Sequence, residues 1–277
     1  MKKSNQSVSL IALMLLVFQL MMPTLMAQPI PTSNGPIGSI LSVSDSGQIK
    51  YWNNTAWIAV SPGLPGQSLR FVNGIPTWIN NPNIVLDYDG NVYDTIHIGT
   101  QIWMKQNLKV THYRNGDAIP NVSDGTWPSL TTGAYNNYNN DANNAITYGR
   151  LYNYYTIEDA RNLCPNGWHV STTDEWMTLT TYLGGQDIAG IKLKEVGTAH
   201  WGGNAGATNE SNFTALPGGF SFYSGGYGYL GQYGTWWSTP ETSPTTASYW
   251  YIDGVPTFAY VASDSKNYGF SARCVKD

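Results

Sequence analysis

Residues 163–176 read Leu-Cys-Pro-Asn-Gly-Trp-His-Val-Ser-Thr-Thr-Asp-Glu-Trp, and this stretch decides how the fold is interpreted. Its turn formers at 165–167 would close a short helix that we expect over residues 159–163. Thr172 and Glu175 have the spacing of a capping box, in which each side chain accepts a hydrogen bond from the other residue's backbone N–H. We therefore expect a second helix to begin here.

Apolar spacing supports this second helix. Trp176, Leu179 and Leu183 follow at i, i+3 and i+7, which places them on one helical face. Gly184 and Gly185 then supply a stop, because glycine readily adopts the left-handed conformation that ends helices. After residue 213 the sequence shows only short strand-like stretches and Gly/Tyr turns, so two short helices are expected in all.

The segments before this stretch indicate strands and loops. Residues 84–86 and 92–98 flank an Asp89-Gly90 turn, a pattern that predicts a β-hairpin. Residues 114–147 are rich in Asn, Gly and Thr without apolar periodicity, which indicates long ordered loops. The fold class is therefore α+β over residues 84–277, with two short helices and several short antiparallel strands.

Composition narrows the class of protein. Of the 277 residues, 13% are aromatic and 12% are charged, and this charged fraction is about half the ~25% of an ordinary domain. Intrinsically disordered chains combine high charge with few aromatic residues, so disorder is excluded for the bulk of the chain. A long coiled coil is excluded because Ala, Glu, Lys and Leu do not dominate.

The first 27 residues resemble a secretory signal peptide. Lys2 and Lys3 precede a nearly continuous apolar stretch over residues 10–20, and Ala27 offers a small residue at the cleavage position. The alternative is a retained membrane anchor, although the apolar stretch is shorter than the roughly 20 residues that span a bilayer. Cleavage would leave 12 basic and 18 acidic side chains, a net charge of −6. That sign excludes a nucleic-acid partner, which would require a basic surface.

Cys164 and Cys274 are the only cysteines. An even number of cysteines in an exported protein usually indicates a disulfide. The alternative is two separate thiols.

Residues 28–83 differ in amino-acid composition from the rest of the chain. They are rich in Pro and Gly and contain a weak repeat, since the sequence at 38–41 (Gly-Ser-Ile-Leu) is echoed at 66–69 (Gly-Gln-Ser-Leu). Each copy is followed by a turn and an aromatic stretch, which predicts short β-hairpins. So small a segment would struggle to fold alone. We expect a β-hairpin stalk or linker that packs on the main domain or on copies of itself, which is a route to a homo-oligomer.

Five blocks of sequence, in order, resemble one family. They lie at residues 99–108, 163–170, 213–219, 236–239 and 269–275. Together they are similar to the Fibrobacter succinogenes major paralogous domain, and the resemblance covers about residues 84–277. The family is similar in turn to the C-type-lectin-like fold, including its formylglycine-generating-enzyme branch. In C-type-lectin-like domains a disulfide ties an early helix to the final strand, and Cys164 and Cys274 occupy matching places.

The chemistry of these relatives does not carry over to this sequence. The enzymes of that branch use a copper-binding cysteine pair, whereas both cysteines here are expected to be structural. The Ca²⁺-binding runs of the sugar-binding lectins do not occur. Asp87, Asp89 and Asn91 begin like a calcium loop, but the later glycine and glutamate of that motif are missing. We expect no metal, no cofactor and no catalytic residues.

Aromatic and small polar residues concentrate over residues 222–268. Exposed Tyr and Trp side chains offer rigid contact area with a polar end, which suits recognition. In a strand over 248–253, alternation would place Tyr249, Tyr251 and Asp253 on one face and Trp250 and Ile252 on the other. Trp236 and Trp237 are expected in the core. The candidate ligand-binding residues are Tyr249, Tyr251, Asp253, Tyr260, Asp264 and Asn267.

The sequence thus predicts a non-catalytic binding module that is secreted or displayed on the cell surface, or exported to the periplasm. It would recognise a glycan or a protein through its C-terminal aromatic face, with no membrane span after signal cleavage. The alternative is a structural component of a surface assembly whose aromatic face contacts another subunit.

Overall fold

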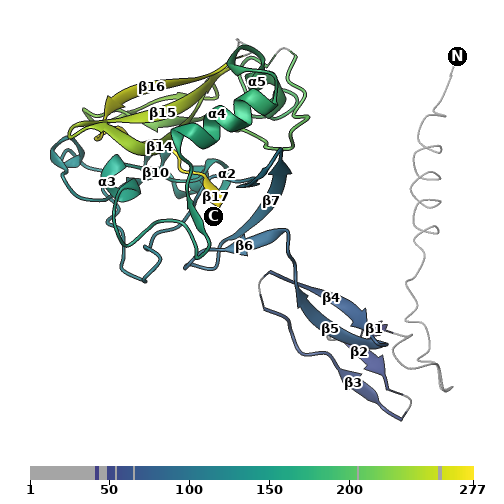
Figure 1. Ribbon diagram of the computed structural model, residues 1–277. Helices are drawn as coiled ribbons and strands as arrows, with labels where there is room; N and C mark the ends of the chain where they lie inside the picture. The colour runs from purple at the N-terminus through teal and green to yellow at the C-terminus, as the bar shows by residue number, and fades with distance from the viewer. Residues whose placement is uncertain (1–40, 44–48, 54, 65, 205, 255–257) are drawn as a thin grey trace, which may run out of the picture. The chain divides into compact units, whose positions relative to one another are not determined.

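The computed structural model describes residues 41–43, 49–53, 55–64, 66–204, 206–254 and 258–277 (Figure 1). The signal peptide expected at residues 1–27 lies outside them. The chain divides into two compact units. Of the described residues, those up to 62 together with 69–77 form one unit, and those of 63–68 and 78–277 form the other, called here the C-terminal unit.

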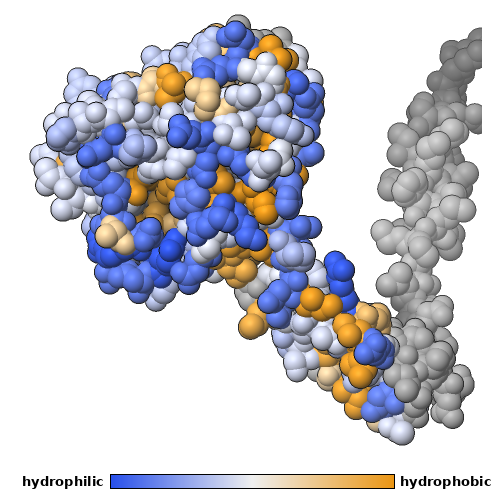
Figure 2. All heavy atoms as spheres, viewed as in Figure 1, coloured by the Kyte–Doolittle hydropathy of each residue, from blue (hydrophilic) through white to orange (hydrophobic). Residues whose placement is uncertain are grey.

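The described residues between 41 and 80 form short antiparallel strands. A three-stranded sheet contains β1 (Leu41–Val43), β2 (Ile49–Trp52) and β3 (Trp57–Ala59), and a two-stranded sheet contains β4 (Gln67–Val72) and β5 (Ile75–Asn80). Asn73 and Gly74, with φ of 50° and 80°, make the tight turn between β4 and β5. Several apolar side chains of these hairpins are exposed, as the orange patches on this part of Figure 2 show; they are Phe71, Val72, Ile75 and Ile79.

The start and the end of the C-terminal unit share one antiparallel sheet of five strands. Its order is β11 (Trp168–Val170), β17 (Cys274–Lys276), β8 (Gln101–Met104), β7 (Val92–Ile98) and β6 (Ile84–Leu86). The hairpin predicted around Asp89-Gly90 is present as β6 and β7, and Gly90 has a φ of 79°. The predicted final strand pairs with both β11 and β8.

A second sheet consists of β14 (Tyr233–Ser243), β15 (Thr246–Asp253) and β16 (Ala259–Ser265), with β15 in the centre. β14 is eleven residues long and β15 is eight, so the expectation of only short strands after residue 213 was wrong. Two further antiparallel pairs are β9 (Tyr135–Asn136) with β10 (Leu151–Tyr152), and β12 (Gly218–Ser221) with β13 (Tyr227–Leu230).

The described residues of this unit contain four α-helices where two were predicted. They are α2 (Ala142–Tyr148), α3 (Tyr154–Ile157), α4 (Thr173–Tyr182) and α5 (Gln186–Leu193), and two 3₁₀ turns occur at η1 (Trp127–Ser129) and η2 (Tyr138–Asn140). The predicted capping box begins α4, with Glu175 N donating to Thr172 Oγ1 at 3.1 Å and Thr172 N donating to Glu175 Oε2 at 2.8 Å. Gly184 and Gly185 follow this helix with positive φ, as expected.

The helix predicted over residues 159–163 is absent, and turns occupy this segment. The Asp159 carboxylate accepts a hydrogen bond from Arg161 N at 2.9 Å, and Asn162 has a φ of 61°. Aspartate side chains compete with helical backbone bonding in this way, so a local turn forms here.

Two hydrophobic cores flank the second sheet. Neighbouring residues of β14 point to opposite faces, so Trp237 enters a first core and Trp236 enters a second one, and both are fully buried as predicted. The second core is packed by the apolar face of α4, where the Trp176 ring stacks on Trp250 at 5.7 Å. Trp103 of β8 contacts Trp176 edge-on at 5.1 Å.

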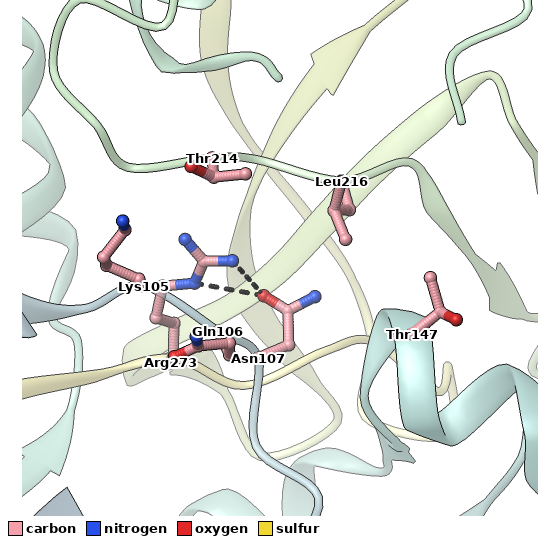
Figure 3. A pocket seen from close by; sticks show the side chains of 7 residues that line it. All are labelled: Lys105, Gln106, Asn107, Thr147, Thr214, Leu216 and Arg273. Atoms are coloured by element: carbon pink, nitrogen blue, oxygen red, sulfur yellow. Dashed lines mark hydrogen bonds between the residues drawn. The ribbon is translucent and has the colours of Figure 1, made fainter. Parts of the chain in front are cut away.

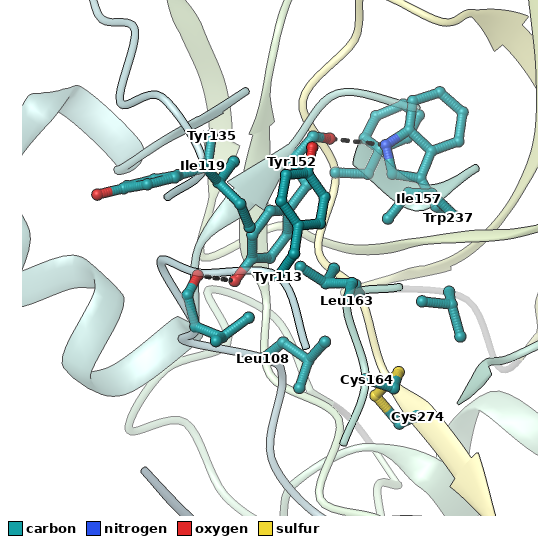
Figure 4. Packing of buried hydrophobic residues seen from close by; sticks show 14 of the residues in the cluster. Leu108, Tyr113, Ile119, Tyr135, Tyr152, Ile157, Leu163, Cys164, Trp237 and Cys274 are labelled. Carbon is teal, nitrogen blue, oxygen red and sulfur yellow. Dashed lines mark hydrogen bonds between the residues drawn. A yellow bond between two sulfur atoms is a disulfide. The ribbon is translucent and has the colours of Figure 1, made fainter. Parts of the chain in front are cut away.

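The first core contains the disulfide (Figure 4). Cys164 and Cys274 are bonded, with their Cα atoms 6.1 Å apart, which confirms the predicted pairing. In the same core Trp237 Nε1 donates a hydrogen bond of 2.7 Å to the backbone carbonyl of Tyr152. Among the described residues, no helix is both long enough and apolar enough to cross a membrane.

Candidate functional site

Alternation along β15 places its tyrosines as predicted. Tyr249 and Tyr251 share a face, whereas Trp250 and Ile252 are buried on the other face in the second core. The register sets Tyr249 opposite Trp237 and Ala262. Because directly opposed residues of antiparallel strands lie on the same face, the tyrosine face continues across all three strands.

A groove of about 410 Å³ lies on this face. We call it the aromatic groove. It is lined by Phe220, Phe222, Tyr229, Tyr233, Thr235, Tyr249, Tyr251, Ala262 and Tyr268. Strands β12 and β13 supply Phe220 and Tyr229, the turn between them supplies Phe222, β14 to β16 supply the next five, and Tyr268 follows β16. None of the nine carries a formal charge at neutral pH.

Ring contacts around the groove form a closed circuit. Tyr251 contacts Tyr233 at 6.2 Å between ring centroids, Tyr233 contacts Tyr229 at 5.1 Å, and Tyr229 stacks on Phe220 at 5.2 Å. The circuit continues from Phe220 to Tyr268 at 5.9 Å and from Tyr268 to Phe270 at 5.3 Å. It closes from Phe270 to Tyr249 at 4.4 Å and from Tyr249 to Tyr251 at 6.1 Å. Each ring therefore supports its neighbours, which holds the surface in shape before any ligand arrives.

The rings differ in burial. Phe270 is 1% exposed and belongs to the first core, on which Tyr249 packs. Tyr229 is 45% exposed. The groove thus has a rigid base continuous with the core and an open rim.

Glycines shape the β12–β13 hairpin that forms one wall. Gly225 and Gly226 have φ of 89° and 82° in the turn, a conformation that disfavours other residues. A side chain at Gly228 would meet the Phe222 ring at 2.9 Å. Glycine at 228 therefore lets Phe222 fold over its own hairpin and line the groove.

Two carboxylates influence the groove from outside its lining. Burial raises the pKa of Tyr233, and its hydrogen bond to Asp253 raises it further. Burial, with a smaller contribution from the charge of Asp264, raises the pKa of Tyr249 to about 12. The same two effects raise the pKa of Tyr268. These hydroxyls therefore stay protonated at neutral pH, where they can donate as well as accept hydrogen bonds.

Comparison with known domain families identifies the family of this chain. The model of the Fibrobacter succinogenes major domain matches residues 96–276. The chain belongs to this family. No curated protein and no solved structure matches the chain.

In this Fibrobacter succinogenes major domain, the predicted site residues do not all gather at the groove. Tyr249 and Tyr251 line it, and Asp253 and Asp264 lie close enough to affect its tyrosines. Tyr260 is outside the lining, and its hydroxyl donates a hydrogen bond to Asp187 of α5.

Asn267 is engaged in holding a loop. Its side-chain Nδ2 donates to the Leu130 carbonyl at 2.8 Å and to the Trp127 carbonyl at 3.4 Å. Trp127 Nε1 in turn donates to the Asn267 carbonyl at 2.7 Å. The structure thus gives Asn267 a role in joining the 127–130 loop to the segment after β16.

Of the nine lining residues, the candidate list contained only Tyr249 and Tyr251; it missed Phe220, Phe222, Tyr229, Tyr233, Thr235, Ala262 and Tyr268. Phe220 lies two residues before the aromatic-rich region that was singled out, and Thr235 and Ala262 are small. Thr235 and Ala262 reach the groove through the pairing of β14 and β16 with the central strand β15, so only the register of this sheet could have identified them. Among the residues that the structure describes, no group of three or more His, Cys, Asp or Glu side chains could hold a metal ion.

Proposed function

We propose that this chain is a non-catalytic binding module, exported through a signal peptide at residues 1–27, that recognises a neutral glycan in the aromatic groove. The closed circuit of rings around an open groove carries the proposal. Aromatic rings offer flat apolar faces on which the C–H faces of sugar rings can stack, and tyrosine adds a polar end. A rigid binding surface also reduces the entropy lost on binding.

The polar groups of the groove favour a hydroxylated ligand. Five tyrosine hydroxyls and the Thr235 hydroxyl belong to lining residues. Asp253 and Asp264 make the surroundings negative, and no cationic side chain lines the groove. We therefore propose that uronic-acid and sulfated glycans are rejected. A C-type-lectin-like architecture for residues 84–277 is part of the same proposal, since in some relatives with that fold the last strands and their loop form the ligand-binding face.

Glycan-array screening of the full mature chain, followed by calorimetry, tests this function. The informative variant is Tyr251→Ala, because Tyr249 also packs on the first core and its removal would confuse binding with stability. Loss of a central ring should weaken binding at least tenfold. Tyr182→Ala is the matched control, because Tyr182 is 65% exposed on α4 and does not line the groove.

Self-association is the competing outcome. If no neutral glycan binds and Tyr251→Ala instead lowers the molar mass measured by light scattering, the groove is a subunit contact and the glycan proposal is wrong. Deleting residues 28–83 separates this result from association through the hairpins, because the deletion leaves the groove intact.

A further inference from the structure

A second cavity in the C-terminal unit shares no residue with the aromatic groove. Its volume is about 150 Å³, and it lies where β8 leads into the following loop, beside the end of the chain. It is lined by Lys105, Gln106, Asn107, Thr147, Thr214, Leu216 and Arg273 (Figure 3). Nothing in the proposed glycan recognition uses these side chains.

Arg273 is a buried cation at this cavity. It is 1% exposed, and its guanidinium lies 4.0 Å from the Phe213 ring centroid and 5.6 Å from that of Trp236. These rings stabilise the positive charge through their faces. Because the rings contact the face of the guanidinium, the N–H groups at its edge remain available for hydrogen bonds.

Within the part of the chain that the structure describes, the hydrogen bonds of Arg273 leave two of its donors unused. Nε and Nη2 both donate to Asn107 Oδ1, at 3.0 and 2.6 Å, and Nη1 donates to the Phe213 carbonyl at 2.9 Å. A guanidinium has five N–H groups, so one on Nη1 and one on Nη2 remain. Asn107 is held in place by its own Nδ2, which donates to the Tyr148 carbonyl at 2.8 Å.

No carboxylate compensates this charge among the described residues, where Arg273 forms no ion pair and donates its hydrogen bonds to neutral oxygens. Burial lowers the pKa of Arg273 to about 9. Buried charges in proteins are ordinarily paired. A buried guanidinium with spare donors beside a cavity is therefore an incomplete ion pair.

Lys105 brings a second cation to the same cavity. Its ammonium has no hydrogen bond or ion pair among the residues that the structure describes, and Figure 3 shows it on the side of the guanidinium away from Asn107. Thr147 and Thr214 add hydroxyls, and none of the seven lining residues is acidic. Water occupies about 30 Å³ per molecule in the liquid, so the cavity of about 150 Å³ has room for about five waters and can hold one tetrahedral oxyanion.

We propose that this cavity binds one small oxyanion of the phosphate or sulfate type, with the spare N–H groups of Arg273 and the ammonium of Lys105 as its cationic partners. Arginine donates to two oxygens of such an anion in a fixed geometry, and lysine adds a point charge. The anion would complete the ion pair that the chain leaves open.

Titration calorimetry of the full mature chain tests the proposal, with sodium phosphate and sodium sulfate compared against sodium chloride at equal ionic strength. We expect saturable binding of one oxyanion per chain and a melting temperature that rises with its concentration, since a ligand that binds only the folded state stabilises it. Lys105→Gln should weaken binding about tenfold, the effect of losing one charge-assisted contact. Lys276→Gln removes the same charge from an exposed position outside the cavity and should leave the affinity unchanged.

Arg273→Lys keeps the positive charge and removes the planar donor pair, so it should also weaken binding; if this variant does not fold, the comparison of the two lysine variants decides. The proposal is overturned if phosphate and sulfate produce no saturable effect beyond that of chloride. It is equally overturned if Lys105→Gln and Lys276→Gln weaken binding alike, which would indicate general screening of charge.

Discussion

Removing the Cys164–Cys274 disulfide should cost about 5 kcal/mol of unfolding free energy. The bond closes a loop with a sequence separation of 110 residues, and the chain-entropy relation for a loop of that length gives about 4.8 kcal/mol at 25 °C. The perturbation is the double variant Cys164→Ala/Cys274→Ala, measured by urea unfolding. With a urea dependence of about 2.5 kcal/mol per molar, the midpoint should fall by about 2 M.

A reduced wild-type sample is the matched control, because it loses the cross-link and retains both sulfur atoms. Both cysteines are almost fully buried, at 1% and 0% exposure. The double variant should therefore be somewhat less stable than the reduced wild type, because it also loses the packing contacts of the two sulfur atoms. The reasoning is refuted if the oxidised and reduced wild-type proteins differ by less than about 1 kcal/mol, because the cross-link would then constrain the unfolded chain far less than its loop length implies.

Two further predictions concern pH. The pKa of Tyr249 is raised to about 12 from 10.0 in the unfolded chain, so the contribution of its protonated hydroxyl to stability is present below pH 10.0 and is lost as the pH rises toward 12. Ultraviolet titration of Tyr249→Phe should show one fewer tyrosine ionising near pH 12 than the wild type. If the variant instead loses a tyrosine that ionises near pH 10, this prediction is wrong. Burial alone would lower the pKa of His169, but hydrogen bonds to Asp277 and Glu175 raise it above 6.5. The contribution of the His169 imidazolium to stability is therefore fully present below pH 6.5 and is lost as the pH rises through the folded-state pKa. His169→Gln should lower the free energy of unfolding more at about pH 5.5 than at about pH 9. An equal loss at both pH values would show that the imidazolium contributes nothing.

Local signals predicted part of the fold well. The capping box at Thr172 and Glu175 specified the start of α4 because its hydrogen bonds form within four residues of sequence. Helix α5 was missed because Gly185 begins it without a side-chain cap and Gly190 lies inside it. Its place in the structure depends on Ala189 and Leu193 packing in the second core, which is a tertiary effect.

The candidate site likewise contains residues that local sequence patterns predicted and residues that they did not. Tyr249 and Tyr251 were identified because alternation along one strand is a local property. Their partners across the groove come from a separate hairpin, so no pattern within β15 could predict Phe220 or Tyr229. Asn267 was included for its polar side chain, which the structure shows bonded to the carbonyl of Leu130.

The central claim is that the aromatic groove binds a neutral glycan, and its most direct test is the affinity of Tyr251→Ala relative to that of Tyr182→Ala for a glycan bound by the wild type. The account predicts that binding weakens at least tenfold in the first variant and stays unchanged in the second. Equal affinities in the two variants, or a wild type that prefers sulfated and uronic-acid glycans, would contradict it.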